Sequence, residues 1–411
     1  MHRRQILLRD PAAVSGKLAK MAEHPFDYLR GSLGQWVRDT TEPGAPGALA
    51  TTVEVPAAAH MLLLGDPHPE NLGTFLPPDG ALIVDWNDFD AATWGPWTHD
   101  LRRLATALRV FLVGSPLEPG DVDRATEAIV HGYAAGLDGV EVPRGRIVED
   151  LVTRAEAASR AAPEFARVED GQPDDDLAPV SETERRAVLQ FVGRWPESCL
   201  GGCDDGPAKT VLRRLGAGVA SYPLMRWYVR LEGPTAADDD DVEIELKEVA
   251  PAPVLTTSPA LVAWGFSDNA ERVVLAQRTL MATPVGDRRL GFAAIDTWSV
   301  RVREHTPSQQ GLSRARVLAR LDDGRWQASD IVALALVLGQ RLGAAHARSP
   351  LGPDTLTRAG AVLRPAVTAA EARLAAETLA FARFMAARVV ADHALLVDLL
   401  ASEGPLLGFT P

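Results

Sequence analysis

The sequence predicts an α+β protein in which a short antiparallel sheet interrupts a mainly helical chain. Stretches near both ends place apolar residues at helical spacing, whereas residues 209–249 alternate between strand-like runs and turn signals. Hydrophobic residues make up 46% of the 411 positions, which is enough for a large core. We expect a helical segment over 1–205, a sheet-containing lobe over 206–305 and a helical remainder over 306–411.

The first quarter of the chain predicts helices followed by two short strands. Residues 12–40 should form helices that break before Pro25, because proline lacks the amide that a helix interior needs. Residues 41–60 are rich in proline, alanine and glycine and predict a loop. The apolar runs 61–64 and 81–84 then predict two buried strands in a hairpin-like arrangement. Their polar ends would meet at one place.

Helices are predicted to follow up to about residue 200, and the pattern changes at about residue 206. A polar, acidic gap at 168–178 interrupts the helical stretch and predicts a surface loop. The later elements, in order, are strands within 209–233, a strand at 242–249, a helix at 267–282, strands at 288–295 and 297–304, and helices at 329–348 and about 366–401.

Acidic and amide side chains follow each of the two predicted hairpin strands. Residues 65–73 read GDPHPENLG and residues 85–90 read DWNDFD. Oxygen ligands of this kind suit Mg²⁺, and a further aspartate can accept a proton. The pattern therefore favours a Mg²⁺ and phosphate site, although Asp, Asn, Gly and Pro also form ordinary turns. We assign Asp66 as the base and list the metal ligands as Asn71, Asp85 and Asp88.

The sheet-containing lobe carries a second set of candidate residues. Gly216 and Gly218 stand in a turn between strands, where backbone N–H groups could approach a phosphate. Lys247 lies on a strand that alternates charged and apolar residues, and the next helix carries Glu271. We expect Lys247 to bind nucleotide phosphates and to pair with Glu271. The charged side of this strand could also simply face solvent.

Strand, glycine turn, strand, strand with lysine and helix with glutamate is the order of elements in the small lobe of a protein kinase. Asp66 and Asn71 also have the five-residue spacing of a kinase catalytic loop, and Asp85 follows where a second metal ligand is expected. Here, however, the catalytic half comes first. The sequence therefore predicts a bilobed, protein-kinase-like fold that is circularly permuted, which domains often tolerate.

The run GD-x-H-P-x-N, DW-x-D and GP-x-x-x-D-L resembles the signature of aminoglycoside and choline phosphotransferases. In that signature the last aspartate, here Asp100, braces the catalytic loop, and we expect His68 to orient the same loop. Together with the segments LKE, ERVVLAQR and LGAAHARS, these motifs resemble the uncharacterised bacterial domain-of-unknown-function family 2252, which is grouped with protein-kinase-like folds. The resemblance implies ATP and Mg²⁺ as cofactors.

The leading hypothesis from the sequence is an ATP- and Mg²⁺-dependent phosphotransferase that acts on a small hydroxylated molecule. Two alternatives stay open. The first is a kinase-like protein that binds nucleotide but has a regulatory role or transfers AMP. The second is a metal-dependent hydrolase built on the acidic segments alone, which would act without ATP.

Composition narrows the partners and the compartment. A net charge of −13 argues against a nucleic-acid or anionic-membrane surface. No apolar run reaches the roughly 18 residues that predict a membrane helix, and the N-terminus lacks a signal-peptide core, so we expect a cytoplasmic protein. Cys199 and Cys203 would then be reduced. The sequence carries no indication of oligomeric state.

Overall fold

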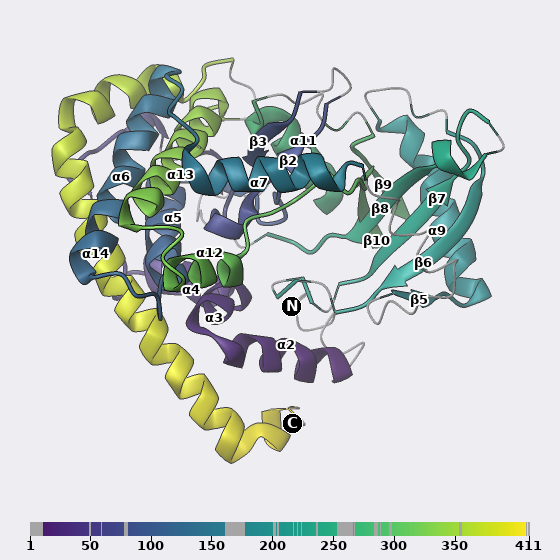
Figure 1. The fold of residues 1–411 in the computed structure, drawn as a ribbon, viewed down its shortest axis with the longest axis horizontal. Helices are drawn as coiled ribbons and strands as arrows, with labels where there is room; N and C mark the ends of the chain where they lie inside the picture. Colours follow the sequence, from purple (N-terminus) through teal and green to yellow (C-terminus); the bar gives the residue numbers. More distant parts are fainter. Residues whose placement is uncertain are drawn as a thin grey trace.

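Two parts face each other in the computed structural model, a helical part and a smaller part built on a six-stranded sheet (Figure 1). The structure describes residues 11–48, 51–58, 60–77, 81–160, 177–199, 203, 205–216, 218–219, 221–222, 224–235, 237–252, 266, 268–282, 287, 289–295, 298–352, 356–407 and 409. Most of the predicted turn at 77–80 and of the predicted loop at 168–178 lies outside these residues.

The helical part is assembled from both ends of the chain. Its helices are α2 (Pro11–Glu23), α3 (Pro25–Gly31), α4 (Leu33–Thr41), α5 (Thr98–Phe111), α6 (Pro119–Asp138), α7 (Gly145–Ala158), α12 (Arg314–Asp322), α13 (Ala328–Arg348) and α14 (Gly360–Glu403). The predicted break before Pro25 is present: His24 caps α3 by accepting a hydrogen bond from the Phe26 amide.

Helices α6 and α13 lie in close contact at the centre of this part. Their glycines allow the approach, because an added Cβ on Gly136 would lie 2.1 Å from the Gln340 carbonyl oxygen and one on Gly343 would lie 2.1 Å from that of Tyr133. By length and composition α13 could cross a membrane, but most of it is buried inside the protein.

The six-stranded sheet is antiparallel and has the order β5-β6-β7-β8-β10-β9. Its strands are β5 (Leu177–Pro179), β6 (Ala208–Arg214), β7 (Arg226–Leu231), β8 (Val242–Glu248), β9 (Gly291–Ile295) and β10 (Trp298–Glu304), accompanied by helices α9 (Glu182–Arg194) and α11 (Asn269–Leu280). Ile244 and Leu246 belong to a separate hydrophobic core that also contains Val188 and Phe191 of α9. The alternating side chains Glu243, Glu245 and Lys247 are also buried, so this side of the strand does not face solvent.

Residues 177–199 belong spatially with the sheet, although they precede the boundary expected at residue 206. Strand β5 pairs with β6, and Phe191 and Trp195 are buried in the core of the sheet. Cys199 and Cys203 are joined by a disulfide, which corrects the expectation of two reduced thiols.

The predicted hairpin is wrong in its strand pairing. Strand β1 (Met61–Leu63) pairs with β4 (Thr93–Gly95), and β3 (Ile83–Trp86) pairs with β2 (Leu72–Phe75). Leu72 and Gly73, expected at the end of the polar segment 65–73, belong to β2, whose four residues are all buried. Because β2 is nearer to β3 along the chain, it takes the position that was assigned to residues 61–64.

Candidate functional site

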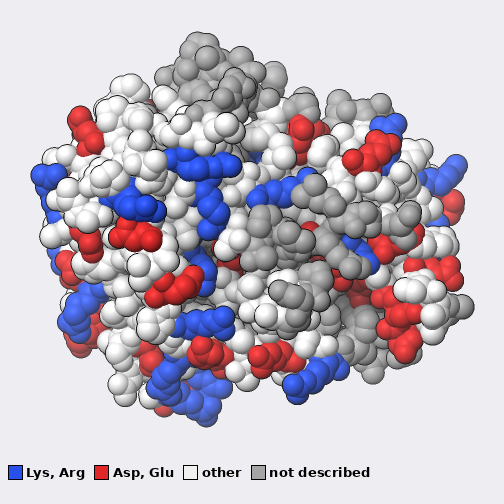
Figure 2. Space-filling view, turned by 90° about the horizontal axis from the view of Figure 1, so that it is seen from above, with Lys and Arg blue, Asp and Glu red and all other residues white. Residues whose placement is uncertain are grey.

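A cavity of about 300 Å³ lies where the loops after β1 and β3 meet the charged face of the sheet. Its described lining includes six cationic side chains and three carboxylates, an excess of positive charge in a protein whose net charge is −13. Elsewhere, basic and acidic side chains are intermingled on the face shown in Figure 2. The charged lining residues are Lys17, Arg30, Asp66, Asp88, Asp90, Arg226, Lys247, Arg301 and Arg303.

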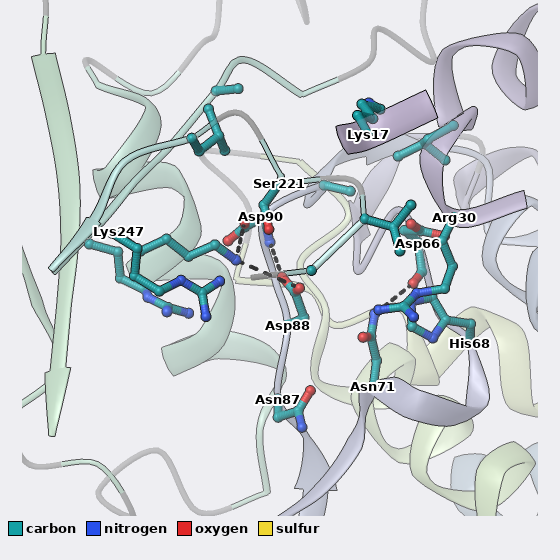
Figure 3. A pocket seen from close by; sticks show the side chains of 18 of the residues that line it. Lys17, Arg30, Asp66, His68, Asn71, Asn87, Asp88, Asp90, Ser221 and Lys247 are labelled. Carbon is teal, nitrogen blue, oxygen red and sulfur yellow. Dashed lines mark hydrogen bonds and ion pairs between the residues drawn. The ribbon is translucent and has the colours of Figure 1, made fainter. Parts of the chain in front are cut away.

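Lys247 connects the two sides of the cavity. From strand β8, its ammonium group lies 2.6 Å from a carboxylate oxygen of Asp90 and 3.9 Å from one of Asp88 (Figure 3). Burial alone would raise the pKa of Asp88, but the charge of Lys247 and a hydrogen bond from the Asp90 amide outweigh burial and lower that pKa. Asp88 is therefore an ionised carboxylate at neutral pH.

Asp66 lies on the opposite side, in the loop after β1. Its carboxylate accepts a hydrogen bond of 2.8 Å from Nε of Arg103, a fully buried side chain of α5. Burial raises the pKa of Asp66, and the charge of Arg103 opposes that shift. A held carboxylate with a raised pKa is suited to accept a proton from a hydroxyl group.

Asn71 and His68 lie in the same loop as Asp66 (Figure 3). The amide nitrogen of Asn71 donates to the backbone carbonyl of Asp66 at 3.0 Å, which holds the loop closed. His68 is buried, and its Nδ1 has no hydrogen-bond partner among the described residues. Burial and the charges of Arg30 and Arg103 hold the pKa of His68 well below its usual range, so this imidazole is neutral.

Asp100 fixes the start of this loop through hydrogen bonds to its backbone. At the first turn of α5, its fully buried carboxylate accepts hydrogen bonds from the backbone amides of Leu64 and Gly65 at 2.8 and 3.0 Å. His346 of α13 lies 3.2 Å from the same carboxylate, and the Tyr133 hydroxyl lies 2.8 Å from the other nitrogen of His346. The loop is thus positioned by buried side chains from α5, α6 and α13.

Three predicted site residues lie differently from expectation. Asp85 does not line the cavity: its buried carboxylate accepts hydrogen bonds from the Trp86 and Ala282 amides, and burial raises its pKa. Gly216 offers its carbonyl to Lys20 at 2.6 Å, whereas Gly218 lines the cavity. Glu271 lies in the first turn of α11, and the ion pairs of Lys247 go to Asp88 and Asp90 instead.

The arginines on the sheet side of the cavity (Arg226, Arg301 and Arg303), together called the sheet wall with Lys247, and Arg103, which holds Asp66, were not predicted from the sequence. Arg226 on β7 and Arg301 on β10 each stand directly opposite Lys247 in the strand register. Period-two alternation could have shown that these strands carry charges on one side, but only the register places the three cations in one row.

The described residues around the cavity do not form a complete metal cage. No group of three or more His, Cys, Asp or Glu side chains is arranged to hold a metal ion within the described part of the chain. Mg²⁺, however, is commonly held by one or two carboxylates together with water and substrate phosphates. Asp88 and Asn71, which both line the cavity, carry oxygen atoms of the kind that Mg²⁺ prefers.

No solved structure and no curated protein is detectably similar to the chain. A family model described as "Uncharacterized protein conserved in bacteria (DUF2252)" matches residues 9–160 and 147–399. These two matches span both the helical part and the sheet, and therefore every residue discussed at the cavity. The chain belongs to this uncharacterised bacterial family.

Proposed function

We propose that the protein is an ATP- and Mg²⁺-dependent phosphotransferase with a permuted, kinase-like bilobed fold, and that it acts on a small hydroxylated molecule. The observation that carries this proposal is the ion pair of Lys247 with Asp90 and Asp88. Through this ion pair, a lysine of the sheet shares one cavity with the carboxylates of the loops after β1 and β3 and with the side-chain amide of Asn71.

The permutation is supported by where α13 ends. The Ser349 hydroxyl, directly after this helix, donates to the Leu62 carbonyl of β1 at 2.8 Å, and the Leu62 amide donates to Pro350. A helix near the C-terminus thus ends beside the strand that leads into the Asp66 loop. In an unpermuted kinase-like chain the corresponding helix would continue directly into that loop.

The residues of the cavity divide into three roles in the proposed reaction. Asp66 accepts the proton of the acceptor hydroxyl while the hydroxyl oxygen bonds to the terminal phosphorus of ATP; the bond from that phosphorus to the bridging oxygen breaks, and ADP leaves. Asp88 and Asn71 would hold Mg²⁺, which would neutralise charge on the phosphate oxygens. Lys247 binds the phosphates from the sheet side. Asp100, through the Leu64 and Gly65 amides, is a positioning residue that keeps Asp66 in place.

Isothermal titration calorimetry with ATP, with and without Mg²⁺, tests the nucleotide site. We expect Mg²⁺-dependent binding to the wild-type protein and a loss of at least about tenfold in affinity for Lys247→Ala, because a charge-assisted contact to phosphate is removed. Lys209→Ala is the matched control, since Lys209 pairs with Asp238 and Asp241 on the same sheet but outside the cavity. Equal loss in both variants would contradict the proposed role of Lys247.

Mass analysis of acceptor products then separates the possible chemistries. Phosphoryl transfer should be abolished in Asp66→Asn while Mg²⁺-dependent ATP binding persists, because the base is not a principal nucleotide contact. Adenylylated products would indicate AMP transfer instead. Turnover without ATP that is indifferent to Lys247→Ala would indicate a hydrolase, and absence of ATP binding to the wild type would refute the phosphotransferase proposal.

A further inference from the structure

Three cations form one row across the sheet wall of the cavity. The strand register places Arg226, Lys247 and Arg301 side by side on β7, β8 and β10. Like charges directly opposite one another on adjacent strands destabilise a sheet. Arg303, two residues further along β10, adds a fourth cation to the same wall.

Three carboxylates pair with the four cations of this wall, which leaves one positive charge in excess. Asp88 and Asp90 pair with Lys247. Glu245 is buried and pairs with all three arginines, at 3.2 Å to Arg226 and 3.1 Å to Arg303 and also with Arg301. One carboxylate therefore serves three guanidinium groups. Arg301 is 1% exposed, and its Nε has no hydrogen-bond partner among the described residues. Buried donors in this state are suited to an anion with several acceptor oxygens.

The described lining of the same cavity offers a nucleobase aliphatic contacts, such as those of Leu33, Val219 and Leu224, but no Phe, Tyr or Trp ring on which it could stack. A second cavity of about 120 Å³ shares the lining residues Asn87, Arg226 and Arg303 with the first. Glu245 also lines this second cavity. The Tyr228 and His305 rings of this second cavity stack on each other, with centroids 4.5 Å apart.

We propose that the larger cavity, which contains Lys247, recognises its phosphoryl donor through the polyphosphate chain and not through the base. Arg226, Lys247, Arg301 and Arg303 bind the phosphate oxygens, and Asp88 would hold the Mg²⁺ that accompanies them. This inference rests on the proposed phosphotransferase function and names its donor class: nucleoside triphosphates of any base, and inorganic tripolyphosphate as a ligand of the same site.

Calorimetric titration of the full-length protein with ATP, GTP, tripolyphosphate and adenosine, each with Mg²⁺, tests this inference. We expect the three phosphate ligands to bind within about threefold of one another and to compete, and adenosine not to bind. Arg226→Gln should weaken all three by about tenfold or more, whereas Arg226→Lys should retain most of the affinity because it keeps the charge. The control is Arg325→Gln, an exposed arginine that pairs with Asp323.

The possible outcomes separate this inference from the proposed function. ATP binding that is more than about tenfold tighter than that of GTP and tripolyphosphate, or measurable binding of adenosine, would overturn the inference and leave the phosphotransferase intact. Binding of tripolyphosphate without either nucleotide would uphold the polyphosphate site and overturn ATP as the donor. Absence of binding by any phosphate ligand would overturn both. An unchanged affinity in Arg226→Gln would contradict the role of the cationic row.

Discussion

At the scale of single residues, burial and neighbouring charge set the protonation states around the cavity. Asp66 and Asp88 are both aspartates in loops that follow short strands, yet their pKa values shift in opposite directions. Burial dominates at Asp66, whereas at Asp88 the charges of Lys247 and nearby arginines and a hydrogen bond from the Asp90 amide together outweigh burial. One carboxylate is thereby suited to proton transfer and the other to holding a cation.

Asp287 provides a residue-scale prediction about pH and stability. Burial raises its pKa to about 6, and its Oδ2 has no hydrogen-bond partner among the described residues. Because the folded pKa exceeds the unfolded value of 3.8, the ionised carboxylate destabilises the fold as pH rises from about 4 to above 6. Asp287→Asn should therefore increase the free energy of unfolding by about 2 kcal/mol at pH 8 and have little effect at pH 4.

Urea denaturation of Asp287→Asn and of the wild type at pH 4, 6 and 8 measures this difference. Asp398→Asn, at an exposed position on α14, is the control and should show no comparable pH-dependent gain. A gain at pH 4 that disappears at pH 8 would have the wrong sign and would reject the explanation.

At the scale of elements, the contact between α6 and α13 helps to position the loop that carries Asp66. Gly132 and Gly136 on one helix and Gly339 and Gly343 on the other bring the two backbones into direct contact. The same two helices carry Tyr133 and His346, which lead to Asp100 and from there to the Gly65 amide. Helix packing and loop geometry are therefore coupled.

Gly136→Ala tests this packing. Although alanine favours a helix by about 1 kcal/mol relative to glycine, the new Cβ would lie 2.1 Å from the Gln340 carbonyl oxygen, so we expect a net loss of about 2 kcal/mol or more in unfolding free energy. Gly193→Ala in α9 is the matched control: no atom lies within 4 Å of its added Cβ, so it should be neutral or stabilising. Thermal and urea unfolding of both variants would show whether the signs differ.

At the scale of the whole molecule, the two main hydrophobic cores of the described residues meet at one charged cavity. The larger core fills the helical part and extends to Val249 and helix α11, and the smaller one is formed by the sheet and α9. A ligand that contacts both Lys247 and the Asp66 loop should therefore stabilise both parts together.

Scanning calorimetry with Mg²⁺ and ATP tests this coupling. At a ligand concentration about a hundredfold above Kd, we expect about 2.7 kcal/mol of stabilisation and an increase of several degrees in Tm. If the two cores unfold in separate transitions, both should shift. A shift of only one transition would place the ligand away from the cavity between the two parts. A comparable shift in Lys247→Ala would argue against the cavity as the binding site.

Local patterns in the sequence determined the helix break before Pro25, the α+β class, the charged strand that carries Lys247 and the polar segments that carry Asp66, Asn71 and Asp88. These features depend on spacing and side-chain chemistry along a few neighbouring residues, which a sequence displays directly. Family membership, foreseen from the combined motifs, is confirmed by the family model.

Only the tertiary structure decided the strand pairing, the burial of Asp85 away from the cavity, the partners of Lys247 and the row that joins it to Arg226 and Arg301. These features depend on which segments pair and in which register. A shift of one residue turns every side chain of a strand to its other face, so local pattern alone leaves such long-range choices open. The charged residues of the cavity were visible in the sequence, but their arrangement around it arises only from folding.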